Sequence, residues 1–332
     1  MKILVVKPSS LGDVVHSLPF LNSIRSCFPE AKIHWVIARG LEGLLEGNPM
    51  IDGLVIINKD GWKKISRAWK TLREFRELYS RLKRQGYDMV IDLQGLLRSG
   101  LITIGTGAPV RVGFAGAREG STLFYNRKIG TDRNMHAVQR YLKAAGALGC
   151  ESTNVVFPFP LAKKELKGIN EIKSSLKDYA VLVPGARWET KIWPSESFGR
   201  LASMLPLRSV VVGSSGDIPV ADRIVAMSKG KAVSLAGRTS LPELVEVMRG
   251  ARVVISNDSG PMHIAAALNV PVAALFGPTS PERTGPYGEG HVIIRSAKRC
   301  SPCFKKRCRD SSCMKEISPE AVFENITRFL PV

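Results

Sequence analysis

The apolar residues of this chain fall mainly in short runs of aliphatic and β-branched residues, each followed by a polar turn and often by a helical stretch. Short apolar runs between turn-forming residues are typical of strands buried on both faces. The strands predicted in this way span residues 3–6, 33–38, 54–58, 89–93, 110–114, 179–183, 209–212, 233–235, 252–255 and 270–275. Apolar residues recurring every three or four positions predict helices over 14–27, 62–85, 241–248 and 262–268, and another helix from Ser195.

Strand, turn, helix and strand in this order predict an α/β fold, because parallel strands need a crossover connection. The pattern starts at residue 1 and again near residue 179, after a Lys- and Glu-rich stretch. We therefore expect two doubly wound, Rossmann-like domains facing each other across a cleft, at 1–160 and 179–315, joined by a linker over 161–178. Residues 316–332 are expected to form a helix that packs back on the N-terminal domain.

Two polar turns lie close together in the second half of the sequence. Residues 257–260 (Asn-Asp-Ser-Gly) follow the strand at 252–255, and residues 277–281 follow the strand at 270–275. Both turns are expected at the carboxyl ends of neighbouring parallel strands, where open α/β sheets bind ligands. The helix after the first turn would offer free N–H groups to a phosphate. An ordinary, well-capped strand-to-helix turn is the alternative interpretation.

The first strand ends in the turn KPSSLGD at residues 7–13, which places Gly12 and Asp13 at the head of a helix. A carboxylate there stabilises the helix dipole by about 0.3–1 kcal/mol. The same carboxylate, held at the carboxyl end of a strand, can also act as a general base. From these residues alone, helix capping is the safer interpretation.

Composition adds one strong signal. Lys and Arg number 48 against 29 Asp and Glu, a formal net charge of +19. This excess predicts a polyanionic partner, which is nucleic acid, an anionic membrane surface or a phosphorylated substrate. No apolar run is long enough for a transmembrane helix, and the first residues lack the features of a signal peptide. We therefore expect a cytoplasmic protein that rests on a membrane face.

The basic residues gather in two regions of the first half. The amphipathic stretch 62–85, which includes Lys64, is either a solvated face or a surface for anionic lipid or phosphate. The loop-like stretch 117–140 predicts an anion clamp, since guanidinium groups match phosphate geometry. Its basic residues are Arg118, Arg127, Lys128, Arg133 and Arg140. In the second half, Lys191 follows a Gly-containing turn and is either a plain surface lysine or a ligand for a diphosphate.

Four of the six cysteines follow the spacing C-x2-C-x4-C-x4-C, at Cys300, Cys303, Cys308 and Cys313. Reduced thiols in a packed loop are the favoured interpretation, and structural zinc is the alternative because four thiolates can close a tetrahedral site. Disulfides are disfavoured in a chain without an export signal. The sequence has no GxGxxG, GxxxxGK[ST] or HExxH motif, which argues against dehydrogenases and P-loop NTPases.

Taken in order along nearly the whole chain, six motifs resemble those of the lipopolysaccharide heptosyltransferases, family 9 glycosyltransferases with the GT-B fold. The motifs are KPSSLGDVVHSLP at 7–19, DLQGLLRS at 92–99, LFYNRK at 123–128 with HAVQR at 136–140, KIWP at 191–194, NDSGPMH at 257–263 and FGPTSP at 276–281. LFYNRK and HAVQR look most like the enzymes that add the first heptose to the Kdo sugar of lipid A. The cysteine-rich tail is more similar to other members, including second-heptose enzymes.

The resemblance implies roles for individual residues. Asp13 is the implied general base of an inverting transfer from ADP-L-glycero-β-D-manno-heptose. The implied donor-binding residues are Ala186, Arg187, Lys191, Asp217, Asp258, Ser259, Gly260 and His263. The implied acceptor-binding residues are Ser10, Gly12, Lys64, Arg98, Arg118 and Arg140. The chain departs from one first-heptose pattern, since Ala186 and Arg187 stand where that pattern has two threonines beside the diphosphate.

The implied reaction needs no cofactor or metal besides the ADP-heptose donor. The expected partners are Kdo-lipid A and the anionic cytoplasmic face of the inner membrane, and the protein is expected to be a monomer. A second-heptose transferase of the same family is the alternative. An epimerase or another nucleotide-sugar enzyme would share the fold but not the Asp13 motif. A nucleic-acid-binding protein would need aromatic stacking platforms along a basic groove, and only 7% of the residues are aromatic.

Overall fold

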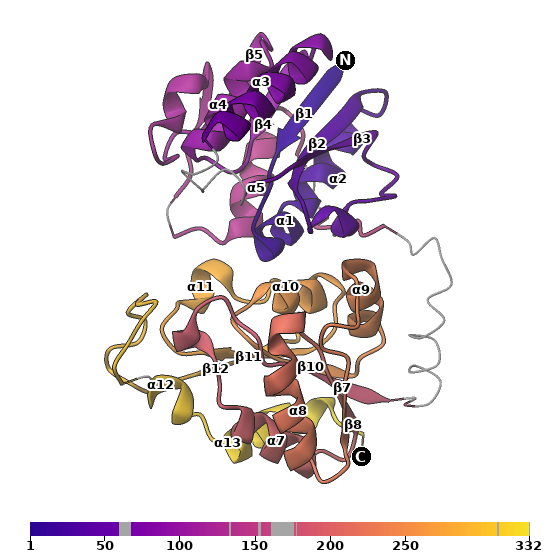
Figure 1. The fold of residues 1–332 in the computed structure, drawn as a ribbon, viewed down its shortest axis with the longest axis vertical. Helices are drawn as coiled ribbons and strands as arrows, with labels where there is room; N and C mark the ends of the chain where they lie inside the picture. The colour runs from indigo at the N-terminus through magenta and orange to yellow at the C-terminus, as the bar shows by residue number, and fades with distance from the viewer. Residues whose placement is uncertain are drawn as a thin grey trace. The chain divides into compact units, whose positions relative to one another are not determined.

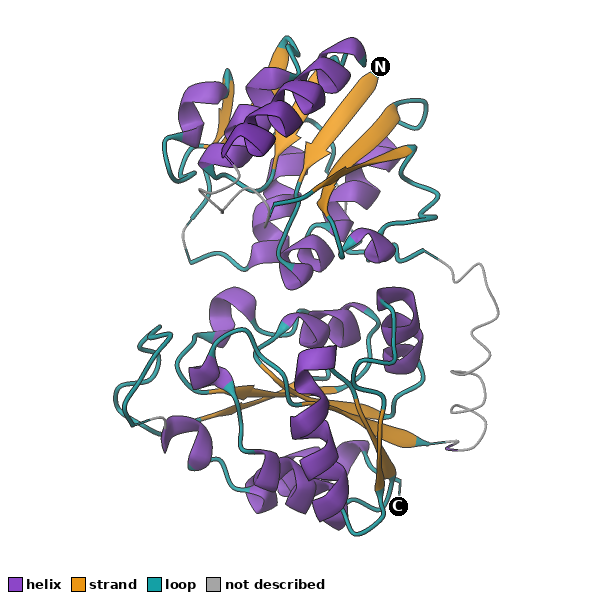
Figure 2. Ribbon diagram, viewed as in Figure 1, coloured by secondary structure: helices purple, strands orange, loops and turns teal. Residues whose placement is uncertain are grey.

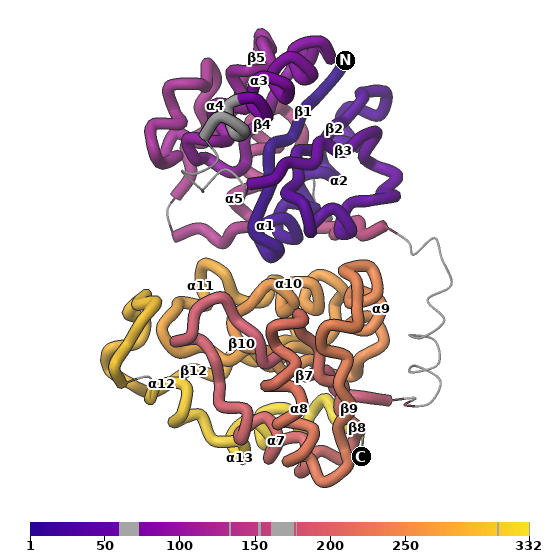
Figure 3. The backbone as a smooth tube through the Cα atoms, in the orientation of Figure 1, coloured from indigo at the N-terminus to yellow at the C-terminus, as the bar shows by residue number. Residues whose placement is uncertain are grey.

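The computed structural model describes residues 1–59, 68–132, 134–151, 154–160, 176, 178–310 and 312–331, with the side chains of 68–72 left out. It divides into two compact units, Met1–Leu161 and Ala162–Val332 (Figure 1). The chain starts in the first unit and ends in the second, as the backbone trace in Figure 3 shows. Each unit contains a six-stranded sheet whose neighbouring strands are all parallel. The predicted α/β fold is therefore confirmed.

The sheet of the first unit has the strand order β3-β2-β1-β4-β5-β6. Its strands are β1 Lys2–Val6, β2 Lys32–Ala38, β3 Gly53–Ile57, β4 Met89–Asp92, β5 Val110–Phe114 and β6 Arg127–Ile129. Its helices are α1 Leu11–His16, α2 Leu18–Cys27, α3 Ala68–Arg84, α4 Leu97–Gly105 and α5 Ala137–Gly146, with short 3-10 turns at Glu42–Leu44 and Ser121–Phe124. The chain order reverses at β1, which lies between β2 and β4, so the turn after β1 lies at a switch point where such sheets bind ligands.

The second unit repeats this arrangement, with the strand order β12-β11-β10-β7-β8-β9. Its strands are β7 Tyr179–Val183, β8 Arg208–Val211, β9 Ala232–Ser234, β10 Val253–Asn257, β11 Val272–Phe276 and β12 Val292–Arg295. Its helices are α7 Ser195–Met204, α8 Ile218–Met227, α9 Leu241–Arg249, α10 Gly260–Ala267, α11 Pro281–Thr284, α12 Ser312–Lys315 and α13 Pro319–Ile326. Short 3-10 turns span Glu189–Lys191, Ser215–Asp217 and Thr327–Phe329. Helices cover both sides of the sheet, α9 and α10 on one and α7 and α13 on the other (Figure 2).

The single helix predicted over residues 14–27 is wrong, because the structure has two. Helix α1 ends at His16, and α2 begins at Leu18 with Pro19 in its first turn. Proline has no N–H to continue the hydrogen-bond ladder of α1, but it is well tolerated at a helix start. Ser17 is the junction, and its hydroxyl donates to the Val14 carbonyl at 2.7 Å.

The loop predicted over residues 117–140 contains regular structure. It includes the edge strand β6, and α5 starts at Ala137. Strand β6 was not predicted because it has only three residues, two of which are basic and exposed. Strand β12 was missed for a similar reason, since half of its residues are exposed at the edge of the second sheet.

The C-terminal helix α13 contributes to the core of the second unit. Val322 and Ile326 of α13 are fully buried in the apolar core that also contains Phe198 and Leu201 of α7. The buried Trp193 indole donates to the Ile317 carbonyl at 2.8 Å and so fixes the start of this segment. The apolar face of α13 therefore completes the core of its own unit. In the described ranges, no helix is long and apolar enough to cross a membrane.

Candidate functional site

The turn after β1 is held from both neighbouring strands. The Lys7 carbonyl accepts a hydrogen bond from the buried Trp35 indole of β2 at 3.2 Å. The Pro8 carbonyl accepts from the backbone N–H of Ala38, at the end of β2, at 3.0 Å. On the other side, the backbone N–H of Ser9 donates to Gln94, in the turn after β4, at 3.4 Å. The turn that leads to α1 is therefore positioned by the core of the sheet.

Asp13 uses its two carboxylate oxygens differently. Its Oδ2 accepts from the Ser10 backbone N–H at 3.0 Å and from the Ser10 hydroxyl at 2.7 Å, which is the capping interaction predicted for α1. Its Oδ1 lies 3.7 Å from the Lys7 ammonium and accepts from the Tyr141 hydroxyl at 3.5 Å. The Asp13 side chain is 38% exposed, whereas that of Lys7 is 2% exposed. A partly accessible carboxylate therefore lies above a buried cation.

Charge and burial act in opposite directions on this pair. Burial raises the pKa of Asp13, but the Lys7 ammonium and the Ser10 hydrogen bonds more than offset it and hold that pKa well below the usual range. Burial likewise lowers the pKa of Lys7, yet the Asp13 carboxylate and Tyr141 together raise it above its usual value. Both side chains are therefore charged at neutral pH.

Helix α5 adds an aromatic ring and a second cation beside this pair. The Tyr141 ring is fully buried, and the Lys7 ammonium lies 5.2 Å from its centroid. The Arg140 guanidinium lies 5.2 Å from the rings of Phe114 and Tyr141, and it donates to the Tyr141 hydroxyl at 3.3 Å. Nε of Arg140 is buried and has no acceptor among the described residues. That orphaned donor makes Arg140 a candidate ligand for an anionic group.

Sequence reasoning missed Lys7 and Tyr141 as site residues. Both border motifs that were recognised, since Lys7 opens the first motif and Tyr141 follows HAVQR directly. A lysine immediately after a buried strand was the available signal. No pattern in the sequence showed that α5 returns to β1.

The turn after β4 is organised by a buried carboxylate. Asp92 accepts from the backbone N–H groups of Gln94 and Gly95 at 2.8 and 3.0 Å, and from the Tyr125 hydroxyl at 2.6 Å. Burial raises the pKa of Asp92, although these hydrogen bonds and Ser99 partly offset it. Asp92 of DLQGLLRS thus meets Tyr125 of LFYNRK in a structural contact that fixes this turn.

The remaining implied acceptor residues are more loosely placed. Ser10 and Gly12 lie in the turn at Asp13. Arg98 is exposed and donates to the Lys59 carbonyl at 3.2 Å. Arg118 is also exposed, and its backbone N–H donates to the Gly95 carbonyl at 2.9 Å. Arg98 and Arg118 are therefore both next to the turn organised by Asp92, whereas Lys64 falls outside the described residues.

In the second unit, Lys191 forms a close ion pair with Asp258. The Lys191 ammonium lies 2.6 Å from Oδ2 of Asp258, and the Thr279 hydroxyl donates to the same oxygen at 2.6 Å. The three residues come from the turns after β7, β10 and β11. The Asp258 side chain is 6% exposed and that of Lys191 is 15% exposed. The two turns singled out in the sequence, at 257–260 and 277–281, are thus joined here by one carboxylate.

Asn257 and Ser259 shape the start of α10. The Asn257 side chain accepts from the backbone N–H of Trp193 at 3.1 Å and donates to the Pro184 carbonyl at 2.7 Å. These two bonds link the end of β10 to the segment after β7. Ser259 is the N-cap of α10, but its side chain caps no N–H. The first turn of α10 starts at Gly260, two residues after Asp258, so its N–H groups and positive dipole end lie close in sequence to the ion pair. His263 is buried one turn further on.

The other implied donor residues lie near Gly185. Asp217 accepts from the backbone N–H and hydroxyl of Ser214, both at 2.7 Å, and so caps its own helical turn. A Cβ atom at Gly185 would lie 2.9 Å from the Asp217 carboxylate, which explains why this position has no side chain. Ala186 is half-buried and Arg187 is exposed. Asp217 therefore has a structural role as a cap, and the exposed Arg187 side chain is accessible to a ligand.

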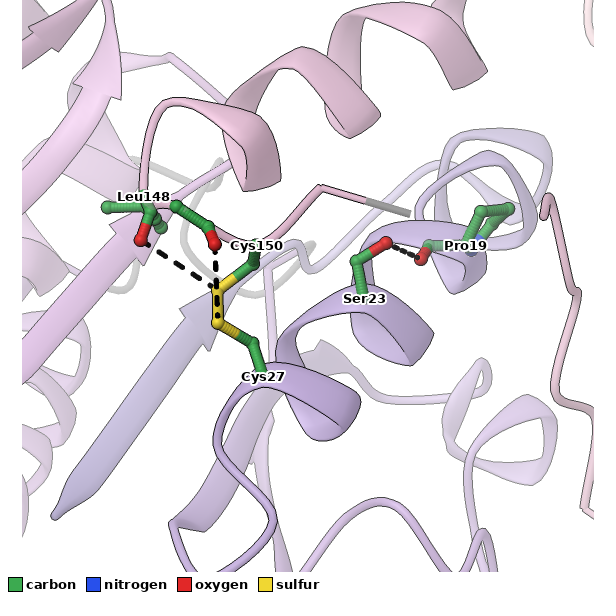
Figure 4. Close-up of a disulfide and its surroundings, with 6 residues drawn as sticks. Pro19, Ser23, Cys27, Leu148 and Cys150 are labelled. Carbon is green, nitrogen blue, oxygen red and sulfur yellow. Dashed lines mark hydrogen bonds between the residues drawn. A yellow bond between two sulfur atoms is a disulfide. The ribbon is translucent and has the colours of Figure 1, made fainter. Parts of the chain in front are cut away.

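The cysteines form two separate groups. Cys300, Cys303, Cys308 and Cys313 line one small cavity of about 40 Å³. Across the part of the chain that the structure describes, no three His, Cys, Asp or Glu side chains are arranged to hold a metal ion. Cys27, at the end of α2, forms a disulfide with Cys150, which follows α5 (Figure 4). The sequence reasoning did not predict this bond.

Comparison with known proteins adds the family. The sequence matches the profile of glycosyltransferase family 9 (heptosyltransferase) over residues 75–313. Lipopolysaccharide heptosyltransferase 1 of Pseudomonas aeruginosa is 35% identical over 318 residues, covering 93% of this chain and 87% of the relative. Lipopolysaccharide heptosyltransferase 2 of Escherichia coli is 27% identical and covers 99% of each chain.

A solved structure agrees with these matches. The E. coli heptosyltransferase WaaC with ADP-2-deoxy-2-fluoro heptose superposes with a TM-score of 0.79 at 26% identity, covering 99% of both chains. The predicted GT-B fold is therefore confirmed. The profile spans well over half of the chain and includes both residues of the Lys191–Asp258 pair. This chain belongs to glycosyltransferase family 9, the heptosyltransferase family, and is a glycosyltransferase.

Proposed function

We propose that this glycosyltransferase moves L-glycero-D-manno-heptose from ADP-heptose to the Kdo inner core of lipid A, with inversion at the anomeric carbon. One observation carries the proposal. Asp13 is an ionised carboxylate whose Oδ2 is committed to Ser10, while Oδ1 lies on a side chain that is 38% exposed. The names of the relatives, which are lipopolysaccharide heptosyltransferases, support the sugar and the acceptor class.

In this mechanism Asp13 is the general base. The acceptor hydroxyl oxygen attacks the anomeric carbon on the face opposite the diphosphate, and a new C–O bond forms as the bond to the diphosphate breaks. ADP leaves with the electron pair, and the hydroxyl proton passes to Oδ1 of Asp13. A carboxylate with a lowered pKa is a weak base, so proton transfer comes late, once bonding to carbon has made the hydroxyl acidic.

The second unit supplies the donor site in this proposal. Lys191 and the first turn of α10 stabilise the negative charge that develops on the leaving diphosphate. Asp258 and Thr279 hold the Lys191 ammonium in place. Arg187 supplies a further cation where a related pattern has a threonine. These groups take the part that a divalent ion plays elsewhere, so transfer needs no added metal.

The first unit supplies the acceptor site in this proposal. Arg140 offers its unpaired Nε to a carboxylate of Kdo, close to Asp13. Arg98, Arg118 and Lys64 contact the anionic groups further along the acceptor. The net charge of +19 suits a protein working on phosphorylated lipid at the cytoplasmic face of the inner membrane.

Mass spectrometry of the reaction product tests this function. The protein is incubated with ADP-heptose and either Kdo-lipid A or the same acceptor already bearing one heptose. We expect one added heptose on Kdo-lipid A, since the 35% identical relative is a type 1 enzyme. Transfer only to the heptosylated acceptor would make the protein a second-heptose enzyme. No transfer to either acceptor would refute the proposed function.

A further inference from the structure

The cysteine-rich segment 300–310 is hydrogen-bonded to two turns of the second unit that lie next to Lys191 and Thr279. Its Phe304 backbone N–H donates to the Pro278 carbonyl at 2.7 Å. Its Lys305 carbonyl accepts from the hydroxyl of the buried Thr190 at 2.8 Å. Thr190 precedes Lys191 and Pro278 precedes Thr279, so both bonds reach residues next to the ion pair. A further bond joins the Ser301 hydroxyl to the Gly277 carbonyl. Segment 300–310 therefore lies against the residues that flank the Lys191–Asp258 ion pair.

This anchoring brings a second lysine to the ring that supports the first. The Lys306 ammonium lies 5.5 Å from the centroid of the Trp188 ring, and the Lys191 ammonium lies 4.6 Å from the same centroid. An indole attracts cations over its face at such distances. Lys191 and Lys306, which are far apart in the sequence, thus both contact the ring of Trp188.

The two lysines differ in how their charge is matched. Lys191 is paired with Asp258 at 2.6 Å, so the two side chains together carry no net charge. Lys306 is exposed, and within the described ranges no carboxylate lies close enough to pair with it. A diphosphate carries several negative charges, and a Lys191 ammonium that is shared with Asp258 cannot neutralise all of them. The ammonium of Lys306 can supply additional positive charge for a diphosphate.

We propose that Lys306 is a second cation for the diphosphate of the nucleotide-sugar donor, positioned by Trp188. This inference rests on the proposed function, because it assumes that the Lys191 site holds a diphosphate. In the reaction, the charge on the diphosphate grows as its bond to the sugar breaks, so Lys306 contributes most in the transition state.

Calorimetry with ADP tests the inference. Lys306→Ala should weaken ADP binding about tenfold, the loss expected for one charged hydrogen bond, while AMP, which lacks the second phosphate, should be affected less. Lys306→Arg should retain most of the affinity. Arg307→Ala is the matched control, since it removes the same charge from the next position, which is also exposed. Thermal unfolding of each variant confirms that it is folded.

The outcomes separate the two proposals. A wild-type protein that does not bind ADP overturns the proposed function, and this inference with it. Normal ADP binding that Lys306→Ala leaves unchanged overturns the inference alone. An equal loss in Lys306→Ala and Arg307→Ala would assign the effect to overall charge and would also refute a specific contact.

Discussion

Asp13 caps α1 through Ser10 and is the proposed general base, and a substitution can separate these two roles. Replacement with Asn keeps the size of the side chain and an oxygen that can accept from Ser10, but removes the basic carboxylate. We expect Asp13→Asn to fold and bind ADP normally while kcat falls by about 10²–10⁴-fold, the usual contribution of a general base. Steady-state kinetics and ADP titration measure the two effects.

A matched control for this variant exists in α9. Glu243 caps that helix through Ser240, accepting from its backbone N–H and its hydroxyl, both at 2.7 Å, as Asp13 does through Ser10. Glu243→Gln changes an acid to an amide in the same kind of cap and should leave kcat unaltered. Near-normal kcat in a folded Asp13→Asn protein would reduce Asp13 to a helix cap and leave the base unidentified.

Lys7 should set the pH range in which Asp13 works. The Lys7 charge lowers the pKa of Asp13, so Asp13 stays ionised far into the acid range. Lys7→Met removes the charge and keeps an apolar stem of similar length, while the burial that raises the pKa persists. We therefore expect the acid limb of the kcat/KM profile to move to higher pH, and activity to be lost as the pH falls through the raised pKa.

Tyr141→Phe refines this prediction, because it removes the hydroxyl that donates to Oδ1 and accepts from Arg140 but keeps the Lys7 charge. Its acid limb should move in the same direction but by less than in Lys7→Met. If the acid limb stays at the same pH in Lys7→Met while kcat falls at all pH values, Lys7 acts by packing alone.

At the scale of elements, the sequence was informative about the sheets and less so about what lies beside them. Buried parallel strands such as β5 and β7 have their predicted bounds, because an apolar run between turns has few other uses. The edge strands β6 and β12 were not predicted, since each has two exposed residues and its mixture of polar and apolar residues resembles that of a loop. The break between α1 and α2 was not predicted, because the helical spacing of apolar residues continues across Ser17.

The same reasoning explains which site residues were predictable. Asp13, Lys191 and Asp258 lie in the segments that follow the carboxyl ends of predicted strands, so chain order alone predicted them near the ligand-binding ends of sheets. Tyr141 and Lys306 act through contacts with residues far away in sequence. Such contacts depend on how α5 and the cysteine-rich segment return to the sheet, and no local pattern encodes that return.

The turn after β4 and helix α5 predict a division of labour between elements. Arg118→Glu and Arg140→Glu should raise the acceptor KM and reduce its dependence on salt, because each reverses a charge on the proposed acceptor side. The donor KM should change little, since Lys191 and Asp258 belong to the other unit. Kinetics with each substrate varied in turn test this. Equal effects on both KM values would contradict the division.

At the scale of the whole molecule, we predict that transfer does not depend on an added divalent ion. Lys191, Lys306 and the start of α10 supply positive charge where the diphosphate would bind. Activity should therefore survive in EDTA. Activity lost in EDTA and restored by Mg²⁺ would refute this prediction.

The four late cysteines need a separate measurement, because zinc there would be structural. Elemental analysis of the protein purified under reducing conditions decides between reduced thiols and a metal site at Cys300, Cys303, Cys308 and Cys313. The favoured interpretation predicts no bound zinc. One zinc per chain would establish the alternative.

The buried lysine beneath Asp13 has a consequence for inhibitor design. Protonated amines are often chosen to mimic the cationic sugar of a glycosyl-transfer reaction, in the hope of pairing with the catalytic carboxylate. Here that carboxylate already has a cation 3.7 Å away that is almost completely shielded from water. A second cation would add little attraction and would be repelled by the first. A neutral hydroxyl or amide donor aimed at Oδ1 should be the better starting point for a competitive ligand.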